Sequence, residues 1–317
     1  MKILVTGGAG FIGSHIVDQL IAKKHDVVIV DNLSTGRREN INSKAKFYHL
    51  DICDKRLAQV FASEKFDAVF HLASQIDARY SVRDPFFDAK TNVLGFLNLL
   101  QNILHFGNQW NKLPKFIFSS TGGALYGEAK KIPTPENHPI NSESPYALTK
   151  KTTEEYLSLY NKLVGLDFIS LRYANVYGPR QNGSREAGVI AIFTERALKN
   201  QRLTVNGDGE ITRDYVYIDD VVRANLLALK KDSVSWKHPD RFLNISTGKE
   251  TNINQIIDYI NRSGKLNVSV FYGEPKQGDI LRSALNYSKA KEILRWEPKY
   301  DLKKGLKKTI DWAKKQK

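Results

Sequence analysis

The sequence has little of several things that define whole classes of protein. Among its 317 residues there is one cysteine, Cys53, which excludes an internal disulfide framework and a zinc site built on cysteines. No apolar run approaches the roughly 18 residues that a membrane helix needs, so we expect no membrane partner. Glycines follow residues 2–6 at once and leave no apolar segment for a signal peptide, and we therefore expect a cytoplasmic protein.

Acidic residues are scarce relative to basic ones. The chain has 48 Lys and Arg against 34 Asp and Glu, for a net charge of +14. This positive net charge favours anionic partners, which can be phosphorylated small molecules or nucleic acid. The densest basic stretch, residues 302–317, interleaves with apolar residues at helical spacing, which is typical of a helix docked by its apolar face. Because no nucleic-acid motif accompanies it, we expect no nucleic-acid partner.

Short β-branched runs alternate with longer amphipathic stretches in the first half of the chain. Strands are expected at 2–6, 26–31, 46–50, 67–72, 115–120 and 167–172, and helices near 11–23, 54–63, 84–106 and 144–163. This order predicts an α/β fold with a Rossmann-type, doubly wound parallel sheet. Beyond residue 173, glycine and proline interrupt the pattern, and we expect helices near 188–200, 218–230, 252–262, 288–294 and 302–315 and strands near 213–217, 242–246 and 268–272.

These later elements indicate a smaller α/β substrate lobe that is interleaved with the first domain. We expect the first domain to comprise residues 1–172 and 215–246, and the substrate lobe to comprise residues 173–214 and 247–317. Crossovers between the parallel strands should be right-handed.

A glycine-rich turn follows the first expected strand. Residues 6–14 read TGGAGFIGS, so Gly8-x-Gly10-x-x-Gly13 has the dinucleotide spacing, and a variant register begins at Gly7. The glycines permit a tight turn and a close approach of backbone to pyrophosphate, and the helix that follows offers free N–H groups. Asp31 ends the second expected strand, where a carboxylate accepts both ribose hydroxyls and repels a 2′-phosphate. The pattern predicts binding of NAD rather than NADP.

A tyrosine and a lysine share one face of a later expected helix. Tyr146 and Lys150 are four residues apart, and an ammonium near a phenol stabilises the phenolate, so we expect a lowered tyrosine pKa and a usable base. Hydroxyl residues 119–121 end an earlier strand, at the edge where open α/β sheets bind ligands. Together with the glycine turn, these features predict a dinucleotide-dependent enzyme.

With these motifs the chain resembles the extended short-chain dehydrogenase/reductases, the NAD-dependent epimerase/dehydratase family, and most closely its UDP-glucose 4-epimerase type. The resemblance is carried by TGGAGFIGS, HLAS at 71–74, Asn92, SSTGGALYG at 119–127, SPYALTK at 144–150, LRYANVYGPRQ at 171–181, RDYVYIDD at 213–220 and QGDILRS at 277–283. It runs nearly from end to end of the chain.

The resemblance implies roles for individual residues. NAD would be held by Gly7, Gly10, Phe11, Ile12, Gly13, Asp31, Asn32, Asp51, Ile52, Leu72, Ala73, Ser74, Asn92, Tyr146 and Lys150. A UDP-sugar would be held by Thr121, Tyr146, Asn175, Val189, Val205, Arg213, Lys276, Asp279 and Ser283. Lys276 stands where the family often has arginine, so a bidentate grip on phosphate would be lost there. Relatives pair through two long helices, which implies a homodimer through residues 84–106 and 144–163.

The implied reaction is the interconversion of UDP-glucose and UDP-galactose, with Tyr146 as base. Thr121 would hydrogen-bond the reacting hydroxyl, although Ser120 is an alternative because the following Gly-Gly lengthens this loop. Dehydratases and decarboxylases of the family carry a carboxylate after this position, and Gly122-Gly123 supplies none. Ser283 is small enough to leave space for an N-acetyl group, so UDP-N-acetylglucosamine is an alternative substrate. A non-enzymatic alternative is an NAD-sensing binding protein. We expect no catalytic metal, since no histidine cluster has metal-ligand spacing.

Overall fold

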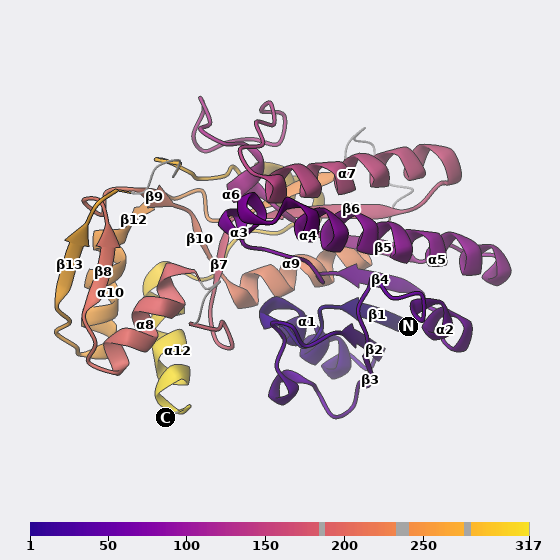
Figure 1. Ribbon diagram of the computed structural model, residues 1–317, viewed down its shortest axis with the longest axis horizontal. Helices are drawn as coiled ribbons and strands as arrows, with labels where there is room; N and C mark the ends of the chain where they lie inside the picture. Colours follow the sequence, from indigo (N-terminus) through magenta and orange to yellow (C-terminus); the bar gives the residue numbers. More distant parts are fainter. Residues whose placement is uncertain (184–187, 233–240, 276–279, 317) are drawn as a thin grey trace. The chain divides into compact units, whose positions relative to one another are not determined.

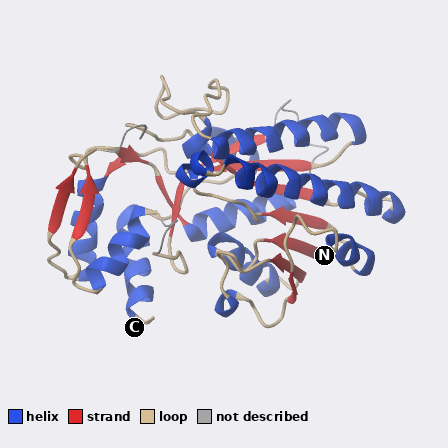
Figure 2. Cartoon of the chain, in the orientation of Figure 1, coloured by secondary structure: helices blue, strands red, loops and turns tan. Residues whose placement is uncertain are grey.

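The computed structural model describes residues 1–183, 188–232, 241–275 and 280–316 (Figures 1 and 2). The strands are β1 (Lys2–Thr6), β2 (Asp26–Asp31), β3 (Lys46–His49), β4 (Ala68–His71), β5 (Lys115–Thr121), β6 (Phe168–Tyr173), β7 (Asn175–Tyr177), β8 (Leu203–Asn206), β9 (Thr212–Arg213), β10 (Tyr215–Tyr217), β11 (Phe242–Ile245), β12 (Thr251–Asn252) and β13 (Val270–Gly273). The helices are α1 (Phe11–Ala22), α2 (Leu57–Ser63), α3 (Ala78–Arg83), α4 (Pro85–Ala89), α5 (Gly95–Trp110), α6 (Gly122–Leu125), α7 (Pro145–Val164), α8 (Val189–Leu198), α9 (Ile218–Lys230), α10 (Ile253–Gly264), α11 (Ser288–Leu294) and α12 (Leu302–Lys314), with a 3-10 turn η1 (Arg38–Asn40) and a π-helical turn η2 (Lys90–Leu94). Within these ranges, no helix is both long and apolar enough to cross a membrane.

Seven strands form one sheet in the order β11-β6-β5-β4-β1-β2-β3. The pairs β1–β2, β1–β4, β2–β3 and β4–β5 are parallel, as near-continuous apolar strands require. One face of the sheet packs against α2, α5 and α7 in a core that includes Leu4, Phe116 and Leu157. Helix α1 packs against β1 and β2 through Ile16 and Val17. The predicted α/β fold with a doubly wound sheet is confirmed.

The chain divides into two compact units that alternate along the sequence. Unit 1 comprises residues 1–125, 142–172 and 222–243, and unit 2 comprises residues 126–141, 173–221 and 244–317. The sequence prediction assigned residues 126–141 to the first domain. They group with unit 2 because Thr134 exchanges backbone hydrogen bonds with Ala284 and Asn286, at 2.8 and 2.9 Å. What each part of the chain binds stays a prediction.

The long helix predicted over residues 84–106 is wrong as a single element. The segment forms α4, the π-helical turn η2 and then α5. Helix α4 begins after Asp84, whose side chain accepts the backbone N–H of Phe87. A π-helical turn adds one residue to the winding, and turns of this kind are frequent at functional sites. In η2 the side chain of Asn92 is buried instead of facing solvent.

Unit 2 contains three two-stranded sheets, β10–β7, β12–β9 and β13–β8, with helices α8, α10 and α12 in mutual contact. The basic C-terminal stretch forms α12, which begins after Asp301, whose side chain accepts the N–H of Lys304. Leu306 and Ile310 are buried, whereas Lys303 and Lys307 are exposed. The prediction of a helix docked by its apolar face is therefore confirmed.

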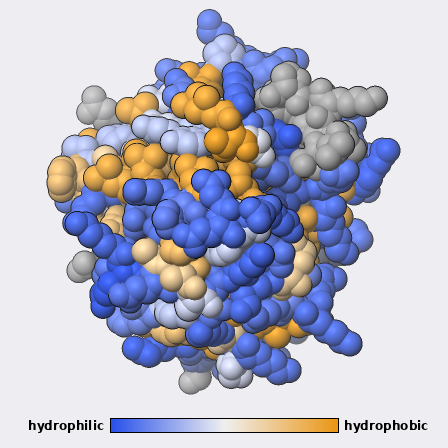
Figure 3. Space-filling model, turned by 90° about the vertical axis from the view of Figure 1, so that its right-hand side faces the viewer, coloured by the Kyte–Doolittle hydropathy of each residue, from blue (hydrophilic) through white to orange (hydrophobic). Residues whose placement is uncertain are grey.

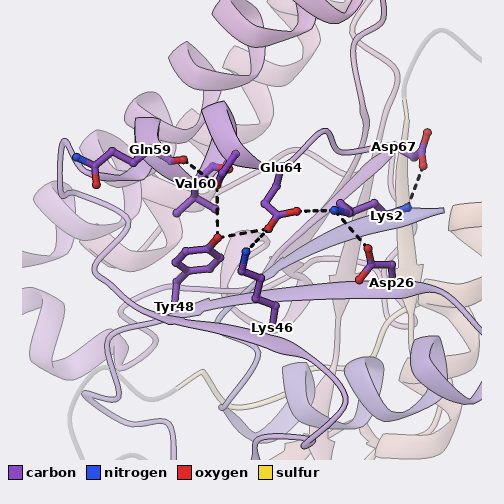
Figure 4. A network of polar contacts seen from close by, with 9 residues as sticks. Lys2, Asp26, Lys46, Tyr48, Gln59, Val60, Glu64 and Asp67 are labelled. Carbon is purple, nitrogen blue, oxygen red and sulfur yellow. Dashed lines mark hydrogen bonds and ion pairs between the residues drawn. The ribbon is translucent and has the colours of Figure 1, made fainter.

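A buried carboxylate ties together the amino-terminal ends of three strands in unit 1 (Figure 4). The side chain of Glu64, only 5% exposed, accepts hydrogen bonds from the ammonium groups of Lys2 at 2.5 Å and Lys46 at 2.6 Å. Lys2 also lies 3.4 Å from the carboxylate of Asp26. Burial raises the pKa of Glu64, but the hydrogen bonds from both lysines outweigh burial and hold it below its ordinary value of 4.5.

Glu64→Gln should lower the free energy of unfolding at pH 7 by about 1–3 kcal/mol, the usual value of hydrogen bonds to a charged group. Because the folded-state pKa of Glu64 is depressed, its contribution is present above about pH 4.5 and is lost as the pH falls through the folded-state value. Urea denaturation at pH 7 and pH 3 measures this. The difference between wild type and variant should shrink at pH 3, and an equal difference at both pH values would contradict the prediction.

Candidate active site

The glycine turn between β1 and α1 forms a cradle in unit 1. Gly7 has a φ of +71°, and a Cβ placed on Gly13 would lie 2.1 Å from the carbonyl oxygen of Gly7. Gly10 precedes α1, and no side chain caps the first turn, which contains Phe11 and Ile12. The turn therefore has room for a phosphate at the exposed N–H groups of the helix. This geometry fits the pyrophosphate of a dinucleotide.

A carboxylate stands at the carboxyl end of β2. Asp31 is 7% exposed and accepts the backbone N–H groups of Ala9 at 2.9 Å and Leu33 at 2.8 Å. A Cβ on Gly36 would lie 2.8 Å from Asp31 Oδ1, so any larger residue there would press against the carboxylate. Its remaining lone pairs suit the hydroxyls of a ribose.

The predicted adenine side is linked to this carboxylate. Asn32, the next residue, donates to the carboxylate of Asp51 at 2.7 Å, and Asp51 accepts the N–H of Cys53 at 2.7 Å. Ile52 is buried and packs against Gly95, where a Cβ would lie 2.7 Å from its Cδ1. Asp31, Asn32, Asp51 and Ile52 therefore lie on neighbouring segments, as the sequence predicts.

The segment after β4 carries the predicted channel residues. The backbone N–H groups of Leu72 and Ala73 both lie 3.3 Å from the hydroxyl of Thr6, at the end of β1. Ser74 donates to the side chain of Asn92 at 2.9 Å. A Cβ on Gly7 would lie 2.7 Å from the nitrogen of Ala73, so this segment lies against the glycine turn.

The tyrosine–lysine pair lies in the first turns of α7, which begins after Ser144, whose side chain accepts the N–H of Ala147. Pro145 suits the first helical position because the N–H that it lacks has no partner there. Lys150 is 4% exposed, and its Nζ donates to the carbonyl oxygen of Ser119 at 2.9 Å. The same Nζ lies 5.9 Å from the ring centroid of Tyr146. The predicted pair is therefore adjacent in space and is linked to the end of β5.

The expected lowering of the tyrosine pKa is wrong for the protein on its own. Burial raises the pKa of Tyr146 to about 12, although a hydrogen bond with Thr121 opposes this. Burial also lowers the pKa of Lys150 to about 8, against the negative charges of Asp88 and Glu154. The spacing of the two residues predicts that a positive charge lies near the phenol. It does not predict that the fold withdraws the phenol from water, which raises its pKa.

The two candidate hydroxyls at the end of β5 are in different surroundings. Thr121 hydrogen-bonds with Tyr146. The hydroxyl of Ser120 is buried and has no hydrogen-bond partner among the described residues. The structure thus places Thr121 beside the tyrosine. Gly122 and Gly123 follow as the start of α6, and they contribute no carboxylate.

Apart from Thr121 and Tyr146, the residues predicted to hold the UDP-sugar belong to unit 2. Asn175 is an exposed residue of β7. Val189 is the first residue of α8, and Val205 of β8 is buried. Arg213 lies in β9 and donates to the carbonyl oxygen of Thr212 at 2.8 Å. These residues come from four separate elements of the unit.

The other residues predicted to hold the UDP-sugar belong to the segment of the chain before α11. Ser283 is half-buried and follows Arg282, which forms an isolated β-bridge with Thr212. Ser283 and Arg213 are therefore on neighbouring segments. Lys276 and Asp279, also predicted to hold the nucleotide, lie outside the described residues.

Sequence reasoning missed one buried acid close to the pair. Asp88 of α4 is fully buried and accepts a hydrogen bond from Thr149, the residue before Lys150, at 2.9 Å. Asp88 and Asn92 are four residues apart, a spacing more typical of a solvated helix face. Only the folded chain brings Thr149 to Asp88.

Comparison with known proteins agrees with this geometry. Residues 3–246 match the model of the NAD dependent epimerase/dehydratase family. A UDP-glucose 4-epimerase of Mycolicibacterium smegmatis is 40% identical over 317 residues, covering 98% of both chains. The structure of a Thermotoga maritima UDP-glucose 4-epimerase with UDP-glucose has a TM-score of 0.94 at 48% identity, covering 100% of this chain and 99% of that one. A Thermus thermophilus UDP-glucose 4-epimerase in complex with NAD has a TM-score of 0.91 at 39% identity, covering 99% of each. The chain therefore belongs to the NAD dependent epimerase/dehydratase family.

Proposed function

We propose that this protein is an NAD-dependent 4-epimerase that interconverts UDP-glucose and UDP-galactose. The observation that carries the proposal is the adjacency of Tyr146, Lys150 and Thr121, with Gly122 and Gly123 following in place of a carboxylate. The glycine turn and Asp31 fit a dinucleotide, as described above. The family and the relatives named above support the same chemistry.

In the proposed reaction, Tyr146 accepts the proton of the sugar's 4-hydroxyl and later returns it. The NAD that the glycine turn and Asp31 would hold would supply a reversible hydride acceptor for C4, so the reaction would need no second substrate. Thr121 hydrogen-bonds the reacting oxygen, and the Lys150 ammonium favours the phenolate. A pocket with no carboxylate after Thr121 lacks the group that dehydration or decarboxylation requires, so the 4-keto sugar is only reduced again.

The unit 2 residues are proposed to hold the nucleotide and the sugar. Asn175, Arg213, Lys276 and Asp279 supply polar groups for the uridine and diphosphate, while Val189 and Val205 supply apolar contacts. This assignment leaves the sugar free to present either face after oxidation, because its attachment is through the diphosphate.

The decisive experiment incubates the purified protein separately with several UDP-sugars and separates the products. We expect UDP-glucose and UDP-galactose to interconvert to one equilibrium ratio from either side, without added reductant. Products of dehydration or decarboxylation, or the absence of any conversion by a protein that binds NAD, would overturn the proposal. The last outcome would favour the NAD-sensing alternative.

Ser283 should decide whether N-acetylated sugars are accepted. Ser283 is small and half-buried. If it borders the C2 substituent of the sugar, as the family resemblance implies, wild type should convert UDP-N-acetylglucosamine as well as UDP-glucose. Ser283→Tyr should lower kcat/KM for the larger sugar by about 5- to 150-fold relative to UDP-glucose, since overfilling a packed site costs about 1–3 kcal/mol. Ser288→Tyr, at an exposed serine of the same unit, is the control. An unchanged ratio would show that Ser283 is not the gate.

We also propose a homodimer that forms through an apolar surface on unit 1. Figure 3 views the end of the molecule where α5 and α7 finish, and apolar side chains gather on its upper left. Leu148, Leu159 and Leu163 of α7 are 53%, 47% and 64% exposed, and they lie on one side of the helix. Phe86 of α4 and Leu94 of η2 are 75% and 56% exposed. Exposed apolar residues that gather on one surface are typical of a protein–protein interface.

Light scattering tests the dimer against the 36.0 kDa of one chain. Wild type should have twice this mass, and Leu159→Glu with Leu163→Glu should reduce it to one chain. Phe271→Glu, at an exposed apolar residue of unit 2, should leave the dimer intact. A wild-type mass of one chain at micromolar concentration would contradict the proposal.

We propose that the protein is located in the cytoplasm, where nucleotide sugars and NAD are both present. The free thiol of Cys53 is compatible with a reducing compartment. Cell fractionation with an antibody against the chain tests this location, and recovery outside the soluble cytoplasmic fraction would contradict it.

A further inference from the structure

A closed polar cluster lies behind the tyrosine–lysine pair in unit 1. Its centre is Asp88, which is fully buried on the short helix α4. One carboxylate oxygen, Oδ2, accepts the hydroxyl of Thr149 at 2.9 Å. The other, Oδ1, accepts the side-chain amides of Gln75 at 2.8 Å and Asn92 at 3.1 Å. Three donors thus hold one carboxylate, and each comes from a different part of the chain.

The cluster links the predicted cofactor segment to the catalytic helix. Asn92 accepts hydrogen bonds from the Ser74 hydroxyl at 2.9 Å and from the Gln75 N–H at 2.8 Å. Its amide donates to the Gln75 carbonyl at 3.0 Å and reaches the Thr149 hydroxyl at 3.2 Å. The π-helical turn η2 is what turns Asn92 into this position. Segment 74–75 and the first turns of α7 are therefore held in register through Asp88 and Asn92.

The Asp88 carboxylate is shielded from water, and burial raises its pKa, while the hydrogen bonds from Thr149 and Gln75 and the charge of Lys150 favour its charged form. Its negative charge raises the pKa of Lys150, with Glu154 acting in the same direction, and it raises the pKa of Tyr146. His71 of β4 is neutral, since burial lowers its pKa to about 3. The other charged side chains of α3, α4 and η2 are at or near the surface: Arg79, Arg83, Asp84 and Lys90. Among the charged residues of α3, α4 and η2, Asp88 is therefore the buried one, and Thr149 links it to the turn of α7 that carries the pair.

We propose that Asp88 is a positioning residue of the 4-epimerase reaction, which fixes the turn of α7 that carries Tyr146 and Lys150 and supplies the buried counter-charge of Lys150. This inference rests on the proposed function. A residue with only a structural role needs hydrogen-bond acceptors at this place, but it needs no charge. Burying a charge is costly even where it is hydrogen-bonded, and neutral acceptors would hold Gln75, Asn92 and Thr149 equally well, so we assign the charge itself to Lys150.

Asp88→Asn separates the charge from the hydrogen bonds. The amide oxygen still accepts from Gln75 and Asn92. The amide nitrogen can donate to Thr149, whose hydroxyl then turns to the carbonyl oxygen of Tyr146, 3.0 Å away. The variant keeps the shape and the contacts of the cluster and loses one negative charge.

The expected result is a shift of the whole pH profile of kcat toward lower pH. Without the negative charge, the pKa of Tyr146 falls, so the acid limb of the profile, where kcat rises with pH, moves to lower pH. The pKa of Lys150 falls too, so the alkaline limb, where kcat decreases, also moves to lower pH. We expect the midpoint of each limb to move by about 1 pH unit, which is the smallest shift that a nearby charge usually causes in a pKa. A merely structural residue would lower kcat or stability without moving both limbs together.

Two further variants complete the test. Asp84→Asn makes the same substitution four residues earlier on the same segment and keeps a good helix cap, so its profile should match wild type. Asp88→Glu keeps the charge and should keep both limbs in place even if kcat falls. A profile of Asp88→Asn that superimposes on wild type, or an equal shift in Asp88→Glu, would overturn the proposal.

A second measurement needs no turnover. The ultraviolet difference between each protein and its Tyr146→Phe counterpart isolates the ionisation of this tyrosine among the 14 in the chain. Its midpoint should be lower with Asp88→Asn than with Asp88 present. If this shift occurs in a protein that does not convert UDP-glucose, the proposed function fails while the charge effect of Asp88 stands. If the protein converts UDP-glucose but the midpoint of Tyr146 does not shift, the proposed function stands and the proposed role of Asp88 fails.

Discussion

Tyr146→Phe should lower the turnover of UDP-glucose by about 10²–10⁴-fold, the usual loss when a general acid–base group is removed. The ring keeps its place on α7, with the Lys150 ammonium 5.9 Å from its centroid. Only the hydroxyl that hydrogen-bonds with Thr121 is lost. NAD binding, which we propose the glycine turn and Asp31 provide, should survive. Initial rates and titration of NAD into the variant measure both quantities.

Tyr156→Phe is the matched control for this prediction. Tyr156 lies on the same helix, and its ring packs near that of Phe96, with centroids 6.4 Å apart. Removing its hydroxyl should leave turnover within about twofold of wild type. If Tyr146→Phe retained turnover close to wild type, the assignment of the base would be wrong.

Glu154→Gln should lower the free energy of unfolding by about 3–5 kcal/mol, because breaking a buried ion pair leaves an uncompensated charge inside the protein. Glu154 of α7 and Arg172 of β6 have side chains only 2% and 3% exposed, and their closest atoms are 2.7 Å apart. Ser170 donates to the same carboxylate at 2.8 Å. Glutamine keeps the size of the side chain, but an NH2 group replaces one of the two carboxylate oxygens and the negative charge is lost. Urea denaturation at pH 7 measures the loss.

The neighbouring residue provides the control. Glu155 is 65% exposed and lies 3.5 Å from Lys151. The same substitution there should change the free energy of unfolding by no more than about 0.5 kcal/mol, as is usual at the surface. Equal effects at the two positions would show that the buried pair contributes nothing special to stability.

Much of the first unit could be predicted from the sequence because its signals are local. The run Val27–Val30 is apolar and lies between two aspartates, and β2 occupies Asp26–Asp31 as predicted. Ser144 followed by Pro145 marks a helix start, and α7 begins there. The glycine spacing and Asp31 likewise depend on one strand, one turn and one helix. Such features need no knowledge of distant parts of the chain.

The rest could not be predicted because it depends on contacts between distant segments. Asp88 and Asn92 are polar residues at helical spacing, and nothing nearby indicates that Thr149, 61 residues after Asp88, satisfies them. The break of the helix at η2 follows from the same contacts. The pKa of Tyr146 depends on how far the fold shields its hydroxyl from water, which the spacing to Lys150 does not report.

The order of the strands has a consequence for synthesis on the ribosome. Strand β11 borders β6 in the sheet, yet it lies about 70 residues later in the chain. While the intervening residues are being made, the nascent chain holds β6 with an unpaired edge, and Phe168 lacks the ring of Phe242 that it meets at 6.2 Å. Open edges of this kind invite pairing with other chains. The emerging protein therefore remains exposed to aggregation late in translation, and a chaperone that holds the nascent chain until residue 245 has emerged would protect it.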